Sequence, residues 1–173
     1  WLWTLPENRE TGLAWLRERG IEAFPHDLLP SAIRVTHSFS SALLREAEEC
    51  GLMVQDLASQ CVVSCCGAQP GEAWWDACAG AGGKALALAS LLGPDGRVLA
   101  TDRRARMLRE LHRRRRSMDV PPMTTRARDL REEGEDAGVF DGVLVDAPCA
   151  GLGTWARNPD ARWRMEARDV RQL

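Results

Sequence analysis

A glycine-rich segment, Asp76-Ala-Cys-Ala-Gly-Ala-Gly-Gly-Lys84, has the composition of a ligand-binding loop. It follows a short apolar run and precedes a helical pattern. Glycines at such a strand-to-helix turn let the backbone bend sharply and approach a ligand closely. We therefore predict that residues 76–84 bind a nucleotide-like ligand.

Two nucleotide fingerprints compete for this glycine pattern. A mononucleotide phosphate loop requires GxxxxGK[ST], but Cys78 stands five residues before Gly83, and Ala85 replaces the hydroxyl residue that binds magnesium. A dinucleotide fingerprint fits better, because residues 80–85 match GxGxxG/A and an acid, Asp102, follows about 20 residues on. An NAD-dependent oxidoreductase is therefore one open alternative.

S-adenosylmethionine is the third candidate ligand, and the acidic residues favour it. The ribose of S-adenosylmethionine can bind Asp102 as the ribose of a dinucleotide does, but S-adenosylmethionine has no pyrophosphate. Asp76, at the end of the first predicted core strand, can hold an amino group, whereas a carboxylate there would repel a pyrophosphate. Asp146 follows another strand in the same way. Ligands bind at the carboxyl ends of parallel strands, so these acids are expected to form one site.

A third motif follows the last apolar run, where a proline–cysteine turn leads into the glycine-rich segment D-A-P-C-A-G-L-G-T at 146–154. Together with V-Q-D-L-A-S-Q at 54–60 and the loop at 76–84, it resembles the Nop/Sun family of RNA cytosine-C5 methyltransferases. The motifs of that family read VQDxAS, DxCAAPGGK and DAPCSGLGT. The resemblance covers about residues 51–163. It departs at Ala150, where the family has serine, and at Gly80-Ala81, where it has Ala-Pro.

The resemblance implies S-adenosylmethionine as the cofactor and RNA, ribosomal or transfer, as the substrate. It places Asp102 on the ribose and Asp129 near the adenine. It also places Lys84, the only lysine in the chain, and Asp146 close to the target cytosine, and makes both catalytic together with Cys149. The expected cofactor-binding residues are Asp76, Cys78, Ala79, Gly80, Ala81, Gly82, Gly83, Lys84, Asp102, Asp129 and Asp146.

Methylation of cytosine at C5 requires a thiolate, because C5 becomes nucleophilic only after a soft nucleophile has added at C6. By the resemblance, the Pro-Cys cysteine, here Cys149, serves chiefly in product release, while the attacking cysteine lies in a later Thr-Cys motif. No Thr-Cys pair occurs in these 173 residues. We therefore expect a C-terminally truncated chain that lacks methyl transfer. A non-catalytic cofactor-binding or RNA-binding fragment is the other open alternative.

The elements that must position these motifs form a Rossmann-like α/β core with a mostly parallel sheet, preceded by a small α+β subdomain. The expected core strands are Ala73–Ala77, Arg97–Thr101, Met123–Arg126 and the apolar run Phe140–Val145, which suits a buried strand. Helices are expected at 83–92 and 103–117, and earlier at 7–19, 41–50 and 54–66, the last with Asp56 as its N-cap. One strand is expected at Ala32–Val35. The predicted boundary, Gln69–Gly71, divides domains 1–70 and 71–173.

Composition limits the remaining function classes. The net charge of -2 gives no global positive field, so an RNA site must be local, and we predict phosphate contacts from Arg113, Arg114, Arg115 and Arg116. The six cysteines lack paired CxxC spacing, which predicts free thiols and no metal site. Neither a membrane-spanning run nor a secretory signal is recognisable, so a cytoplasmic protein is expected.

Overall fold

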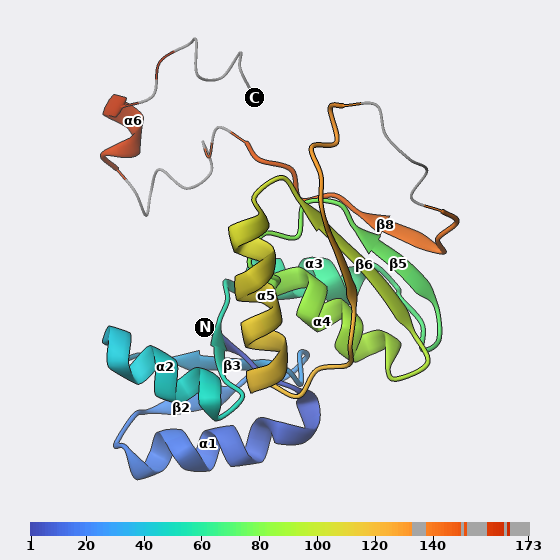
Figure 1. Ribbon diagram of the computed structural model, residues 1–173. Helices are drawn as coiled ribbons and strands as arrows, with labels where there is room; N and C mark the ends of the chain where they lie inside the picture. The colour runs from blue at the N-terminus through green and yellow to red at the C-terminus, as the bar shows by residue number, and fades with distance from the viewer. Residues whose placement is uncertain (133–137, 150, 152–158, 165, 167–173) are drawn as a thin grey trace.

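The computed structural model describes residues 1–132, 138–149, 151, 159–164 and 166. These residues form two four-stranded sheets that are separate in the chain and in space (Figure 1). The first has the strand order β2-β3-β1-β4, and the second has the order β7-β6-β5-β8. None of the helices in the described part of the chain has the length and apolarity needed to cross a bilayer.

The N-terminal subdomain is an antiparallel sheet with helices packed against it. Its strands are β1 (Leu2–Trp3), β2 (Ala23–Pro25), β3 (Ala32–Val35) and β4 (Met53–Val54). Its helical segments are η1 (Pro6–Asn8), α1 (Arg9–Glu18) and α2 (Ser41–Glu49). Leu2, Leu16, Ile33 and Leu52 form the centre of its apolar core and are fully buried. The expected α+β subdomain is confirmed.

Only one of the four strands in this subdomain was predicted from the sequence. The strands β1, β2 and β4 contain two or three residues each, too few for an alternating apolar pattern to stand out. The helix expected at 54–66 begins later, at Leu57, because Met53 and Val54 pair with β1. Asp56 occupies the N-cap position, as predicted, although its side chain makes no capping hydrogen bond.

The core is the predicted Rossmann-like sheet, in which all neighbouring strands are parallel. Its strands are β5 (Ala73–Asp76), β6 (Arg97–Asp102), β7 (Thr124–Ala127) and β8 (Gly142–Leu144). Its helices are α3 (Leu57–Cys65), α4 (Gly83–Leu92) and α5 (Ala105–Ser117), and a short helix α6 (Ala161–Arg164) follows the core in the chain. Asp76 lies opposite Ala100 on one side and Leu144 on the other, so the carboxyl ends of these three strands form one edge.

Helices α4 and α5 lie on the same face of this sheet (Figure 1), because β5, β6 and β7 advance in one direction and such crossovers are right-handed. Residues 85–89 and Leu92 of α4 are all buried, which explains a continuous apolar run instead of an amphipathic pattern. Helix α3 packs against α4, and Trp3 and Met53 join the core cluster. The predicted boundary at Gln69–Gly71 therefore falls between two parts that share apolar packing.

The fourth core strand differs from expectation. It contains three residues instead of six, and Val143 and Val145 are 51% and 62% exposed. Strand β8 lies at the edge of the described sheet, where it pairs with β5 alone. The prediction of a buried strand over Phe140–Val145 therefore does not hold for the described residues, because the strand is shorter and only Leu144 of its three residues is buried.

Candidate functional site

The glycine loop runs across the carboxyl ends of the core strands. The amide of Ala77 donates to the carbonyl of Leu144 at 2.9 Å, and that of Ala79 donates to Thr101 at 2.8 Å. Gly82 has a φ of +91°, and a Cβ atom there would lie 2.6 Å from Cγ of Leu111 in α5. Glycine is needed at this position both for the left-handed conformation and for the close approach to the helix.

Lys84 joins the three motif segments. Its Nζ donates to Oδ2 of Asp146 at 2.6 Å and to Oγ of Ser59 at 3.4 Å. The Lys84 side chain is 16% exposed, whereas that of Asp146 is 60% exposed. The structure thus brings together Lys84 and Asp146, which the sequence predicted as neighbours.

Asp76 is a buried carboxyl group with an unused acceptor. Its Oδ1 accepts a hydrogen bond from the amide of Cys78 at 3.3 Å, while its Oδ2 has no hydrogen-bond partner in the structure. Burial raises the pKa of Asp76 to about 7. An orphaned carboxyl oxygen at the end of a central strand is what the cationic amino group of a methionine moiety would satisfy. The residue therefore fits the predicted cofactor.

Asp102 is in the opposite state, because donors surround its carboxylate. Oδ1 accepts from the amide and Nε of Arg104 at 2.8 and 3.0 Å, and Oδ2 accepts from Nη2 of Arg104 at 3.1 Å and from the amide of Gly80 at 3.0 Å. The hydrogen bonds from the Arg104 side chain hold the pKa of Asp102 below its usual value. Asp102 is thus an ionised acid that contacts the glycine loop directly.

Asp129 lies two residues beyond β7. The amide of Arg128 donates to the carbonyl of Asp102 at 3.2 Å, which brings this segment beside the ribose-binding candidate. Arg131 forms a two-point ion pair with Asp129, at 2.6 Å from Nη2 and 3.0 Å from Nε. Hydrogen bonds from Arg131 lower the pKa of Asp129 to about 2. This acid is therefore ionised over the whole physiological range.

The two cysteines of the predicted site differ in exposure. Cys149 is exposed, and its Sγ accepts a hydrogen bond from the amide of Gly151 at 3.4 Å. Cys78 is half-buried, and burial, followed by the charge of Asp76, raises the pKa of its thiol. An exposed thiol after β8 is available to a substrate, as the prediction for Cys149 requires. Residues 150 and 152–154 of the third motif lie outside the described residues.

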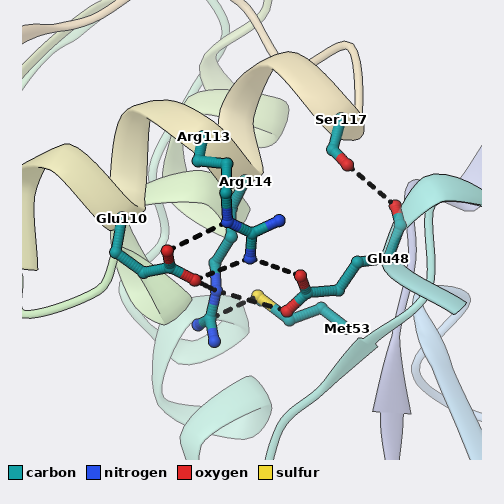
Figure 2. Close-up of polar contacts among 6 residues, drawn as sticks. All are labelled: Glu48, Met53, Glu110, Arg113, Arg114 and Ser117. Carbon is teal, nitrogen blue, oxygen red and sulfur yellow. Dashed lines mark hydrogen bonds and ion pairs between the residues drawn. The ribbon is translucent and has the colours of Figure 1, made fainter. Parts of the chain in front are cut away.

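Two arginines at the end of α5, Arg113 and Arg114, face Glu48 of the N-terminal subdomain (Figure 2). Both Arg113 and Arg114 form ion pairs with Glu110 on their own helix and with Glu48 on α2. Arg115 donates from Nη1 to the carbonyl of Val120 at 3.1 Å. Arg113 and Arg114 are therefore already paired with acids of the chain, which their place in a basic run did not indicate. Arg116 is exposed, and phosphate binding by Arg113–Arg116 stays a prediction.

Two residues contact the site without having been singled out from the sequence. Ser59 lies within the V-Q-D-L-A-S-Q motif, so its presence in a motif was the available signal, although nothing indicated Lys84 as its partner. Arg104 stands two residues after Asp102, a spacing at which an aspartate side chain commonly accepts the backbone amide. The guanidinium contact that follows was not readable from sequence.

Comparison with known proteins agrees with this geometry. Residues 64–173 match the family model described as 16S rRNA methyltransferase RsmB/F. Ribosomal RNA small subunit methyltransferase B from Pectobacterium carotovorum is 34% identical over 173 residues, and that from Citrobacter koseri is 32% identical over 168 residues. The alignments cover 98% and 96% of this chain, respectively, but 39% of each relative, so the chain spans about two fifths of their length.

Solved structures show the same fold. PH0851 superposes with a TM-score of 0.87 at 26% identity, covering 99% of this chain and 40% of that one. NSun6 from Pyrococcus horikoshii superposes with a TM-score of 0.76 at 16% identity, covering 88% and 64% of the two chains, respectively. Fold and site together define a methyltransferase domain with a Rossmann-like sheet.

More particularly, the chain belongs to the RsmB/F family of 16S rRNA methyltransferases. This membership confirms the resemblance drawn from the three motifs and argues against the dinucleotide-dependent alternative.

Proposed function

We propose that this chain is the cofactor-binding part of an S-adenosylmethionine-dependent methyltransferase that acts on carbon 5 of cytosine in ribosomal RNA. The observation that carries the proposal is the contact of Lys84 with both Ser59 and Asp146, because it unites all three family motifs at the carboxyl edge of the sheet. Membership of the RsmB/F family supports the same assignment.

Three acids and the glycine loop would hold the cofactor, which supplies the methyl group when bound. Asp76 offers its unpartnered Oδ2 to the amino group, and Asp102 accepts from the ribose hydroxyls. Asp129, beside Asp102 at the end of β7, is assigned to the adenine end. The remaining contacts come from the loop itself, at Cys78, Ala79, Gly80, Ala81, Gly82 and Gly83.

Lys84, Asp146 and Cys149 would act on the cytosine. The Lys84–Asp146 ion pair presents a cation and a carboxylate side by side, which can donate to and accept from the edge of the base. After methylation, a base removes the C5 proton and the attacking thiolate leaves C6, which restores the aromatic ring. The resemblance assigns Cys149 to this release step, and its exposure suits contact with a bound nucleotide.

Binding of the cofactor product tests the first half of the proposal. Isothermal titration of the 173-residue chain with S-adenosylhomocysteine should show one site, with NAD giving no heat of binding. Asp102→Asn should weaken the site, because an amide can accept fewer hydrogen bonds from the ribose than a carboxylate. Binding of NAD in preference to S-adenosylhomocysteine would overturn the assignment.

Methyl transfer is tested in a chimera in which this chain replaces the matching segment of the Pectobacterium carotovorum relative. Loss of the C5 proton means that RNA made with [5-³H]cytosine should release tritium to water only when S-adenosylmethionine is present. Cys149→Ala in this chimera should accumulate a covalent RNA–protein adduct, because release is blocked after attack. Methylation of adenine without tritium release would contradict the proposed substrate atom.

A further inference from the structure

The carboxylate of Asp102 has no acceptor position left for a ligand. A carboxylate offers about four lone-pair positions. Two on Oδ1 are taken by the amide and Nε of Arg104, and two on Oδ2 by Nη2 of Arg104 and the amide of Gly80. The Asp102 side chain is only 6% exposed. A ribose can therefore bind here only by replacing donors that are already in place.

The four donors differ in how readily they can leave. The amide of Gly80 belongs to the glycine loop, and the amide of Arg104 belongs to the N-cap position of α5, so the backbone fixes both. The guanidinium sits on a side chain that is 54% exposed. It lies against the loop, since a Cβ atom on Gly80 would be 3.9 Å from its Nη2. The two guanidinium hydrogen bonds are thus the ones that can open together.

We propose that Arg104 is an internal competitor for the ribose position, whose guanidinium occupies the two acceptor sites on Asp102 that the 2′- and 3′-hydroxyls of the cofactor require. This inference rests on the proposed function, which assigns Asp102 to the ribose. The exchange keeps the number of hydrogen bonds to Asp102 unchanged, because two N–H donors leave and two O–H donors arrive. The amides of Gly80 and Arg104 stay hydrogen-bonded to the carboxylate throughout.

Removal of the competitor should therefore strengthen cofactor binding. Isothermal titration with S-adenosylhomocysteine should give a dissociation constant about two- to fivefold lower for Arg104→Ala than for the unsubstituted chain, as expected for loss of a partly exposed ion pair. Arg109→Ala is the matched control, since it removes the same charge from an exposed position on the same helix, and it should leave the constant unchanged.

The 2′,3′-dideoxy analogue of S-adenosylhomocysteine separates competition from general electrostatics. It has no hydroxyl to place on Asp102, so it should bind the unsubstituted chain and Arg104→Ala equally. Arg104→Lys, which cannot make the two-point contact, should fall between the unsubstituted chain and the alanine variant for the natural product. If thermal unfolding shows that Arg104→Ala does not fold, Arg104→Lys replaces it as the test of the inference.

The outcomes distinguish this inference from the function on which it rests. Unchanged or weaker binding of S-adenosylhomocysteine by Arg104→Ala, with the unsubstituted chain binding normally, would overturn the role of Arg104 alone. Equal tightening for the dideoxy analogue would also overturn it, because the diol would not be what Arg104 contests. If neither protein binds S-adenosylhomocysteine, the proposed function and the competitor role both fall.

Discussion

Glu48 is the acid that connects the N-terminal subdomain to the core, so its replacement is expected to loosen that junction. The Glu48 side chain is 13% exposed, and it forms ion pairs with Arg113 and Arg114, which are 45% and 25% exposed (Figure 2). Hydrogen bonds to charged groups contribute about 1.5–3 kcal/mol when buried, and exposed pairs about 0.2–1 kcal/mol. Because Arg113 is half-exposed, we expect the contacts of Glu48 to contribute an amount between these two ranges, about 1–2 kcal/mol of the free energy of unfolding.

The measurement is the free energy of unfolding of Glu48→Gln, which keeps the shape of the side chain and the hydrogen bond from Ser117 to the backbone carbonyl of residue 48. The unfolding midpoint should fall by roughly 2–8 °C, at about 2–4 °C per kcal/mol for a chain of this size. Glu49→Gln is the matched control, because it removes the same charge from the same last turn of α2 at an exposed position. Equal midpoints for the two variants would refute the reasoning.

A double-mutant cycle decides whether the loss comes from the ion pair itself. Glu48→Gln and Arg113→Ala should be less destabilising together than the sum of their separate effects, with a coupling of about 1 kcal/mol. High salt should reduce that coupling, since Arg113 is half-exposed. A coupling near zero would mean that the contact in Figure 2 contributes nothing to stability and that the arginines are free to serve another role.

Three further predictions concern the site and the predicted RNA surface. The pKa of Asp76 is raised to about 7 from an ordinary 3.8, so between these values the folded state holds a proton that the unfolded state has lost. The free energy of unfolding should therefore fall by about 1 kcal/mol per pH unit as the pH rises from about 4 to 7. Denaturant titrations of Asp76→Asn should lack this decline. Gly82→Ala should lower the free energy of unfolding by about 1–3 kcal/mol more than Gly67→Ala. Both glycines have a positive φ, but only a Cβ atom at position 82 would meet Leu111. Equal losses for the two variants would exclude the steric cause. Arg116→Ala should weaken RNA binding uniformly across sequences and reduce the salt dependence of log K by about one phosphate contact, whereas an unchanged slope would remove Arg116 from the RNA surface.

The core fold was predictable because its signals are local and long enough to read. Each parallel strand of the core was expected near its observed position, and the apolar run of α4 agrees with the burial of residues 85–89 and Leu92. The short strands β1, β2 and β4 were missed because two or three residues carry no period. The length of β8 was overestimated, since the apolar run at Phe140–Val145 does not show which of its residues pair with a neighbouring strand.

The site was predictable as a set of residues but not as a set of contacts. Motif positions identified Lys84 and Asp146 as neighbours, and the structure joins them at 2.6 Å. The charge run at the end of α5 suggested a free basic surface, whereas Arg113 and Arg114 are neutralised by acids from α2 and α5. Glu48 lies more than sixty positions earlier in the chain than its partners, so only tertiary packing could bring them together.

The two acids of the candidate site differ in electrostatic state, and this difference suits the proposed roles of Asp76 toward a cationic amino group and of Asp102 toward a neutral ribose. The carboxylate of Asp102 is ionised, and donors from the chain itself occupy all its acceptor positions. A ligand hydroxyl can therefore bind it only by replacing a hydrogen bond from the Arg104 side chain. Asp76 is buried with one oxygen unpartnered, and its raised pKa keeps a large fraction of it neutral near pH 7. An arriving ammonium would favour the ionised form of Asp76, so binding of the proposed amino group would lower the pKa of this carboxyl and release part of its proton near pH 7. The unpartnered Oδ2 of Asp76 would at the same time gain a hydrogen-bond donor.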